Sequence, residues 1–543
     1  MATIDFVGAH SAGSKEYDLS SEDQLRFFNA STAAKAKIFS TYGNISFHNN
    51  STAGYSFTIN NYGNTVFYDN SNAGRATFLG INESVVFRNH SNAALSRIVS
   101  SGVVGFDDSS SAGRATIDVS FLGFLQFRDQ STAANSKIKI DGGPMETGAA
   151  AFYGRSTAGT ADITVGSRAY LTFDDQSTAG SAKITNNASP EDGTVGVVDF
   201  SSTAGLQDNH RISAGSIAGA GSYYLGSNQL TVGSLNRNTT VSGSILDGGL
   251  GGGTGGSLVK AGLATLTLTG ANTYSGGTIV NAGRLALASA QAAGTGAITF
   301  ANGAQTLQLD AAALGAPGGT FGNVIANFDY GDTLDLRGLR YAPGAKSALD
   351  GNTLTVTSGS VSESFALSGN YAGRTFQVYN DGASGSALRL IRGTGSAQTV
   401  ASLSGGETLS AEAAHGTLAG TAGSGAGSAP TVLQDGIQDT VLLQGGDEQI
   451  VGFRLKEDVL DLSRILSESH LSASLIQGSP DYIGNHLSLT NSGADATLSF
   501  NPAGNSAGPG RELATLHGVG ADVSLQTLIS GHDLILGPSP MHA

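Results

Sequence analysis

A short polar motif recurs about every twenty residues between residues 27 and 202. This repeat limits the possible folds more than any other feature of the sequence. Each copy carries a motif of the "STAG" type, whose first serine stands at Ser31, Ser51, Ser71, Ser91, Ser110, Ser131, Ser156, Ser177 and Ser202. Four positions earlier stand Phe27, Phe47, Phe67, Phe87, Phe106, Phe127, Phe152, Phe173 and Val198. In most copies an isoleucine or phenylalanine follows the serine by seven positions.

The local pattern inside each copy has a period of two, as in "ATI" and "ADITV", and such alternation is typical of half-buried strands. The longer period predicts one coil of a solenoid, because a single coil cannot bury its own apolar residues. Stacked coils would place phenylalanine on phenylalanine at the strand spacing of ~4.8 Å. We therefore predict a continuous right-handed parallel β-helix from about residue 20 to 310, with Phe67, Phe87 and Phe127 buried and stacked.

The "STAG" motif is expected at a corner of each coil, because its small residues let neighbouring coils approach and its hydroxyl groups can bind turn backbone. The polar residues beside this corner are expected to face solvent in repeated columns, which include Asn49, Asn70, Asn89, Asp108 and Asp129. A structural role is the main interpretation of these columns, and a direct binding role is the alternative.

The composition fits tightly stacked strands and excludes several classes of function. Only 13% of the residues are charged, against ~25% in average domains, and glycine occurs 78 times. The net charge of −15 argues against a nucleic-acid partner and against docking on anionic lipid. Cysteine is absent, which excludes disulfides and cysteine-based metal sites. No apolar run approaches the ~18 residues of a transmembrane helix.

Two segments resemble repeats of bacterial surface proteins. Coils of the form "F-x-x-x-S-T-A-G-x-A-x-I" are similar to those of large bacterial β-strand-repeat surface proteins, over about residues 20 to 210. The stretch "GSLVKAGLATLTLTGANTYSGGTIVNAGRLAL" (Gly256 to Leu287) resembles the passenger-associated β-strand repeat of autotransporters. The second resemblance implies a right-handed β-helix rung, so residues 210 to 315 are expected to continue the rod.

The C-terminal half changes character. The stretches "VIANFDYGDTLDLRGL" (Val324 to Leu339) and "QIVGFRLKEDVLDLSRIL" (Gln449 to Leu466) share an acidic turn followed by D-x-L-D-L. Both resemble modules near the end of proteins exported by bacterial type I systems, and "LQTLIS" is expected to form a short helix in the second. The N-terminus lacks the basic start and apolar core of a secretory signal. We therefore expect export through a C-terminal address.

In the families of type I exported proteins that these modules resemble, the D-x-L-D-L motif often follows glycine-aspartate repeats that bind calcium. This chain has no such array of repeats, so a calcium site would depend on the carboxylate oxygens of separate aspartates. The candidate ligands are Asp329, Asp332, Asp335, Asp447, Asp458 and Asp461. The alternative is that these aspartates form turns or cap helices.

The sequence has no H-E-x-x-H motif, and the stretch "GGGTGG" near Gly251 lacks the Lys-Ser/Thr of a phosphate-binding loop. The pairs Asp107/Asp108 and Asp174/Asp175 are the kind of carboxylates that a β-helix lyase, hydrolase or epimerase uses. They belong to repeated columns, however, whereas a catalytic site should break the repeat. We therefore expect a protein that is not an enzyme.

The sequence thus predicts an all-β protein: a right-handed parallel β-helix followed by smaller β-rich C-terminal modules. The expected segments are the "STAG" solenoid (1–210), its continuation (211–315), a β-rich module (316–392), a Gly/Ala/Ser-rich linker (393–433) and the type I secretion-like module (434–543). We expect a secreted or cell-surface protein in adhesion or matrix assembly, with a polysaccharide, a host or abiotic surface, or a copy of itself as partner. A polysaccharide-active enzyme and a secreted toxin or effector are the alternatives.

Overall fold

The computed structural model describes residues 2–143, 146–316 and 318–391 and, further on, 417–419, 431–432, 440–443, 448–451, 453–455, 458–462, 465–466, 486–504, 510–519, 523–530 and 533–535. The chain divides into two compact units. Unit 1 consists of Met1–Asn370 and Val378–Arg389, and unit 2 of Tyr371–Gln377 and Leu390–Ala543. About 2% of the chain is helical, and unit 1 forms a β-solenoid of about 14 turns, which confirms the predicted fold class.

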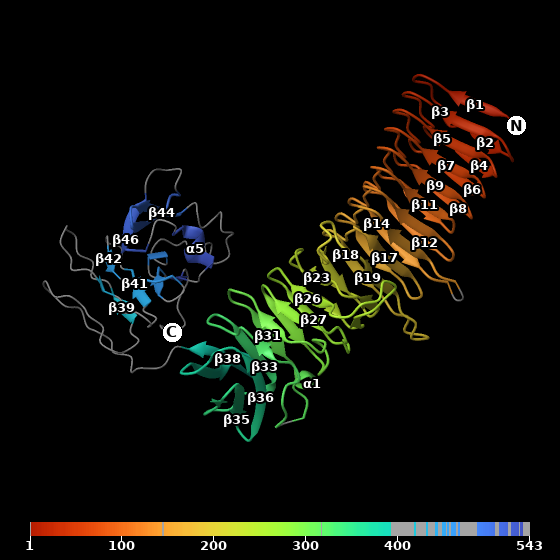
Figure 1. Ribbon diagram of the computed structural model, residues 1–543. Helices are drawn as coiled ribbons and strands as arrows, with labels where there is room; N and C mark the ends of the chain where they lie inside the picture. Colours follow the sequence, from red (N-terminus) through yellow and green to blue (C-terminus); the bar gives the residue numbers. More distant parts are fainter. Residues whose placement is uncertain are drawn as a thin grey trace. The chain divides into compact units, whose positions relative to one another are not determined.

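The first part of the solenoid is built from two parallel sheets whose strands alternate along the chain (Figure 1). One sheet contains β1 (Thr3–Phe6), β3 (Gln24–Phe27), β5 (Asn44–Phe47), β7 (Asn64–Phe67), β9 (Ser84–Phe87), β11 (Val103–Phe106), β13 (Phe124–Phe127), β15 (Ala149–Phe152), β17 (Tyr170–Asp175), β19 (Val197–Thr203), β22 (Ser222–Tyr224) and β25 (Ile245–Leu246). The other contains β2 (Glu16–Leu19), β4 (Lys37–Thr41), β6 (Phe57–Asn61), β8 (Thr77–Ile81), β10 (Arg97–Ser100), β12 (Thr116–Ser120), β14 (Lys137–Asp141), β16 (Asp162–Val165), β18 (Lys183–Asn186) and β21 (Ser216–Ala218).

A second pair of sheets begins at Arg211 and continues the stack. The first contains β20 (Arg211–Ala214), β23 (Gln229–Val232), β26 (Ser257–Lys260), β28 (Thr278–Val280), β30 (Ile298–Phe300), β32 (Ile325–Ala326), β36 (Val361–Ser368), β35 (Thr353–Ser358) and β34 (Lys346–Asp350). The second contains β24 (Thr239–Val241), β27 (Thr265–Leu268), β29 (Arg284–Leu287), β31 (Thr306–Leu309), β33 (Thr333–Arg340), β38 (Gly385–Ile391) and β37 (Thr375–Asn380). The short helix α1 (Ala311–Leu314) follows β31.

The phenylalanine column forms the core of the first part, as the repeat predicts. Neighbouring rings stack with their centroids 4.6–5.0 Å apart, from Phe6 through Phe200. Phe67, Phe87 and Phe127 are fully buried. The stack holds because each strand pairs in register with the strand one coil away, so that Phe67 lies opposite Phe87.

The corners are held by the second residue of the "STAG" motif. The Thr52 hydroxyl accepts a hydrogen bond from the N–H of Gly54 at 3.1 Å, and the corresponding side chain does the same at the other corners. Gly54 has a φ of 63°, in the left-handed region that glycine adopts without a steric penalty. The prediction that "STAG" forms the corner is therefore confirmed.

The structure corrects the two ends of the predicted repeat. The solenoid starts at Thr3, where Phe6 already stacks on Phe27. This start agrees with the predicted segment 1–210 and corrects the limit of about residue 20 given for the continuous β-helix. In the ninth copy, Val198 lies opposite Leu171, and Phe200 takes the core position next to Phe173. The register between β17 and β19 shifts at this point. The assignment of Val198 and Ser202 to the repeat columns is wrong, because Val198 pairs with Leu171 before the shift and Ser202 pairs with Asp174 after it.

Past the passenger-like repeat, the parallel stack ends in antiparallel strands. β33 pairs antiparallel with β38, and β36 continues into the antiparallel partners β35 and β34. These strands carry the sequence of the predicted 316–392 module. β33, β34, β35 and β36 belong to unit 1, whereas Tyr371–Gln377 and the residues from Leu390 onward belong to unit 2.

Gly243 lies where two coils approach closely, and we predict that Gly243→Ala destabilises the protein by about 1–3 kcal/mol, the usual cost of overpacking. A Cβ atom there would lie 1.9 Å from the carbonyl oxygen of Gly221, which belongs to the rigid backbone of the next coil. Chemical denaturation of the full chain measures the loss. Gly322→Ala is the matched control, since a Cβ at Gly322 would meet no atom within 4 Å. Equal stability of the two variants would contradict the close approach at Gly243.

Unit 2 has its own sheets and its own core. Its strands are β39 (Thr417–Ala419), β40 (Thr431–Val432), β41 (Thr440–Leu442), β42 (Glu448–Val451), β43 (Val459–Asp461), β44 (Leu487–Ser492), β45 (Asp495–Phe500), β46 (Arg511–His517) and β47 (Leu534–Ile535). Buried residues of this core include Val441, Leu460, Leu498 and Leu528. Helix α5 (Leu525–Ser530) confirms the helix predicted for "LQTLIS".

Most of the predicted linker 393–433 lies outside the described residues. Within the described part of the chain, no helix is long and apolar enough to cross a membrane.

Candidate functional site

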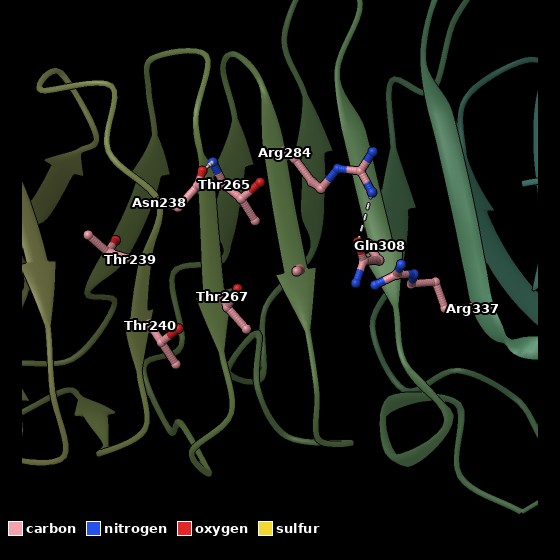
Figure 2. A pocket seen from close by; sticks show the side chains of 9 residues that line it. Asn238, Thr239, Thr240, Thr265, Thr267, Arg284, Gln308 and Arg337 are labelled. Carbon is pink, nitrogen blue, oxygen red and sulfur yellow. Dashed lines mark hydrogen bonds between the residues drawn. The ribbon is translucent and has the colours of Figure 1, made fainter. Parts of the chain in front are cut away.

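An open groove of about 390 Å³ lies on the outward face of the sheet that contains β24, β27, β29, β31 and β33 (Figure 2). Its lining consists of Asn238, Thr239, Thr240, Thr265, Thr267, Arg284, Ala286, Gln308 and Arg337. Five adjacent parallel strands at ~4.8 Å spacing make a face about 20 Å long along the solenoid. The lining thus has two guanidinium groups, four hydroxyl groups and two side-chain amides, and it has no carboxylate.

The strand register builds this lining. Side chains of β27 and β29 alternate between the core and the outward face, so that Leu266 and Leu285 are buried. Thr265 lies opposite Arg284, and Thr267 lies opposite Ala286. Ala286 in turn lies opposite Gln308. Because Ala286 is the smallest residue of its row, the face is hollowed between the threonine end and the arginine end.

Arg284 is held in place by two acceptors, one on β31 and one on β33. Its Nη1 donates to Gln308 Oε1 and to Asp335 Oδ2, both at 2.8 Å. Gln308 Nε2 donates to Asp310 Oδ1 at 3.0 Å, which fixes the orientation of the amide. Burial raises the pKa of Asp335, and the positive charge of Arg284 opposes this rise. The guanidinium of Arg284 is therefore positioned before any ligand arrives.

Arg337 is the second cation of the groove, and it is exposed. Its charge lowers the pKa of Asp335, although less than Arg284 does. In the part of the chain that the structure describes, no hydrogen bond or ion pair engages the Arg337 guanidinium. Arg337 is thus the group of the groove that is available for an external anion.

The predicted calcium ligands of the first module are used for internal contacts. Asp332 is buried, and its two oxygens accept hydrogen bonds from the N–H of Gln305 at 3.0 Å and of Asp329 at 2.9 Å. Burial raises the pKa of Asp332 to about 7, while these two N–H groups lower it. Asp335 pairs with Arg284. The structure therefore gives Asp329 and Asp332 the turn role that was the alternative for these residues, and it does not test calcium binding.

The second set of predicted calcium ligands belongs to unit 2. Asp458 is buried and accepts a hydrogen bond from the N–H of Arg454 at 2.8 Å. Asp461 is buried on β43, and Asp447 lies outside the described residues. Among the residues that the structure describes, no group of three or more His, Asp or Glu side chains is arranged to hold a metal ion. Calcium at these aspartates stays a prediction.

The polar column beside the corner forms a ladder of hydrogen bonds between coils. Asn49 has a φ of 56°, and its N–H donates to Asp69 Oδ2 at 2.8 Å. The same bond joins Asp69 to Asn89, Asn89 to Asp108 and Asp108 to Asp129, at 2.8–3.0 Å. Each of these side chains satisfies the backbone of the previous coil. The structural interpretation is therefore confirmed for Asn49, Asn89, Asp108 and Asp129. The assignment of Asn70 to this column is wrong, because Asp69 takes that place and the N–H of Asn70 donates to the carbonyl oxygen of Asn49.

The carboxylate pairs of the enzyme alternative belong to the same arrangement. Asp108 accepts the N–H of Asn89, and Asp175 accepts the N–H of Gly154 at 2.9 Å. Asp107 forms an ion pair with Arg88 at 3.6 Å. Asp174 accepts a hydrogen bond from the Thr172 hydroxyl at 3.1 Å. Three of these four carboxylates thus contribute to contacts between coils.

A second surface feature is a row of apolar side chains on the outward face of β4, β6, β8 and β10. This apolar row consists of Phe39, Ile59, Leu79 and Val99, which lie opposite one another in register on successive strands. All four are partly exposed, while Ile38, Thr58, Phe78 and Ile98 between them are buried. A solvated strand face is normally polar, and contiguous exposed apolar side chains can mark an interaction site.

Sequence reasoning missed both the groove and the apolar row. Arg284 and Asp335 are separated by 51 residues, and their contact depends on coils of unequal length. The apolar row had a local signal, because "KIFS", "TFLG" and "RIVS" each have two apolar residues at consecutive positions. That signal identifies strands with two apolar faces.

Comparison with known proteins supports the passenger resemblance. Residues 258–287 match the family model described as "PATR: Passenger-associated-transport-repeat". The match extends from β26 to β29, so it includes Arg284 of the groove. No curated protein and no solved structure matches the chain. The chain is therefore a β-solenoid repeat protein that is similar, over residues 258–287, to the passenger repeats of autotransporters.

Proposed function

We propose that this protein is a secreted or cell-surface adhesive or matrix protein that acts by contact along its solenoid rather than by catalysis. The passenger repeat supports a location outside the cell. The apolar row carries the adhesive part of the proposal, because exposed contiguous apolar surface marks an interaction site. The partner of this row is an apolar abiotic or host surface.

The geometry of the apolar row fits this role. Four side chains on adjacent strands are spaced ~4.8 Å apart, so they form a flat strip about 15 Å long. The parallel pairing of β4, β6, β8 and β10 fixes these side chains on one face. Tyr42 and Tyr62, in the turns that follow β4 and β6, stack with ring centroids 5.1 Å apart and are both exposed. A rigid strip requires no ordering on contact, which favours adsorption.

Leu79→Lys is expected to reduce adsorption of the purified protein to a hydrophobic surface several-fold, and Ile59→Lys/Leu79→Lys is expected to reduce it further. Each change removes apolar area that contributes ~25 cal/mol per Å² and places a charge in the strip. Adsorbed mass on a hydrophobic sensor measures the effect. Both residues are partly exposed, so the melting temperature should stay close to that of the wild type.

Thr77→Lys is the matched control for this experiment. Thr77 is also an outward-facing residue of β8, two positions before Leu79, but it lies outside the apolar row. The control adds the same charge to the same strand and should adsorb like the wild type. Equal adsorption of the Leu79→Lys and Thr77→Lys proteins would overturn the assignment of the row.

The enzyme alternative and the effector alternative have weaker support. The paired carboxylates of the enzyme alternative mostly form contacts between coils, and no feature of the described residues favours a toxin. Incubation with acidic and neutral polysaccharides, followed by product analysis, tests the enzyme alternative. Specific cleavage of one polysaccharide would replace the adhesive function with a catalytic one.

A further inference from the structure

We infer that the groove on β24, β27, β29, β31 and β33 binds a segment of an acidic polysaccharide through the carboxylates of its sugar units. This inference deepens the proposed function, on which it rests, by naming a ligand class and a site. The apolar row would then provide general adhesion, and the groove would provide recognition of one kind of polymer.

The charges of the lining select an anionic ligand. Arg284 and Arg337 are the charged residues of the lining, whereas the whole chain carries 43 acidic and 28 basic residues. The guanidinium is planar and matches a carboxylate with two parallel hydrogen bonds. A groove that gathers two such groups on an otherwise acidic protein is suited to a carboxylate ligand and is poorly suited to a cation.

The two arginines differ in how they are held. Arg284 uses its Nη1 for Gln308 and Asp335, while its Nε and Nη2 bind no other described residue. These remaining N–H groups are therefore available to a ligand, and the two acceptors keep the guanidinium in position. Arg337 has no such anchor among the described residues, and it adds a second, exposed positive charge to the lining.

The rest of the lining suits sugar hydroxyl groups. Thr239, Thr240, Thr265 and Thr267 present hydroxyls that can donate and accept hydrogen bonds. Asn238 uses its Oδ1 to accept the N–H of Thr265 at 2.9 Å, so its amide N–H₂ group points elsewhere (Figure 2). The lining contains no aromatic ring and only one apolar residue, Ala286. Such a surface would hold a hydrated polymer better than an apolar peptide.

The shape of the groove favours a polymer over a small molecule. The groove is open to solvent, and its lining comes from five consecutive strands of one sheet (Figure 2). At ~4.8 Å per strand it extends about 20 Å along the solenoid. A linear chain with repeated hydroxyl and carboxylate groups can engage the threonine end and the arginine end together, whereas a single sugar acid would reach only one.

Titration of the full-length protein with oligogalacturonate of about six units tests this inference by calorimetry. Arg337→Gln is expected to weaken binding about tenfold, because one charge-assisted contact is lost. Arg337→Lys should restore part of the affinity, since the charge returns without the planar fork. Affinity should also fall as salt is raised. Arg337 is exposed, so these variants should fold like the wild type.

Two controls separate the groove from general charge effects. Arg75→Gln removes an equally exposed arginine from a corner of the first part of the solenoid and should bind like the wild type. The methyl-esterified hexamer has the same hydroxyl groups without the negative charges, and it should bind weakly and equally to all variants. Poly-glutamate serves as an acidic polymer without sugar units, and binding as tight as that of the uronate would overturn the polysaccharide assignment.

The remaining outcomes also decide between the two proposals. Equal uronate affinity of the wild type and Arg337→Gln would overturn the site. Lack of uronate binding by a protein that still adsorbs through the apolar row would overturn this inference and leave the proposed function standing. Cleavage of the uronate with loss of turnover in Arg337→Gln would support the groove as the binding site and overturn the non-catalytic function.

Discussion

Phe87→Asp is expected to unfold the coils around β9 and to lower the stability of unit 1 by about 5 kcal/mol or more. The Phe87 ring is fully buried and stacks on Phe67 at 4.6 Å and on Phe106 at 4.8 Å. Removing a buried ring costs about 3–5 kcal/mol, and the buried carboxylate adds a further cost. Because each coil contacts only its neighbours, the damage should spread along the stack from this point.

Hydrogen exchange followed by mass spectrometry measures this effect coil by coil. Protection should be lost first in β7, β9 and β11, and least in the sheets that begin at Arg211. Val86→Asp is the matched control, because Val86 lies on the same strand and faces outward. That variant should keep the protection of the wild type. A Phe87→Asp protein with wild-type protection in β9 would contradict the stacked core.

Deletion of residues 434–543 is expected to abolish export and to retain the protein inside the producing cell. The physical basis is that unit 2 has a separate core, which includes Val441, Leu460 and Leu528. The deletion therefore leaves the solenoid core intact. The deleted residues contain the second D-x-L-D-L motif and α5, and they lie in the region that resembles the type I secretion module. Immunoblots of medium and cell fractions from the native host measure the distribution.

Two control proteins make this result specific. Deletion of 393–416 removes the part of the predicted linker that precedes β39 in the sequence, and it should leave export unchanged. Fusion of residues 434–543 to a cytoplasmic cargo protein should bring the cargo into the medium. Circular dichroism of the retained truncation should show the β-signal of a folded solenoid. The proposed address is wrong if the truncated protein reaches the medium in the same amount as the full chain.

The first part of the solenoid could be predicted closely because its coils have nearly constant length. With a period of about twenty residues, Phe47, Phe67 and Phe87 align by counting, and the structure stacks their rings. The same counting failed at Val198, which lies opposite Leu171 and not opposite Phe173. A constant period thus predicts contacts between coils, and one insertion is enough to remove that information.

The candidate site could not be predicted in this way. Thr267, Ala286, Gln308 and Asp335 form one row only because four coils of different lengths stack in register. The burial of Lys260, a residue of the passenger motif, could not be predicted either. Its Nζ donates to the carbonyl oxygens of Ala261, Gly262 and Ala282. Burial lowers the pKa of Lys260 to about 8. Nothing in the motif shows that this charge lies inside.

The sequence by itself determined the period of the solenoid, its core of phenylalanine rings, its corners and its acidic character, because each of these follows from the residues within one coil. Only the tertiary structure decided which outward side chains become neighbours. The stacking of the coils brings Arg284 to Asp335, places Asn49 and Asp69 in a ladder of hydrogen bonds, and aligns Phe39 with Ile59. The physical reason is that the apolar pattern within one coil marks the residues that will be buried. Neighbours on the surface come from different coils, so they depend on the length of every coil that separates them in the sequence.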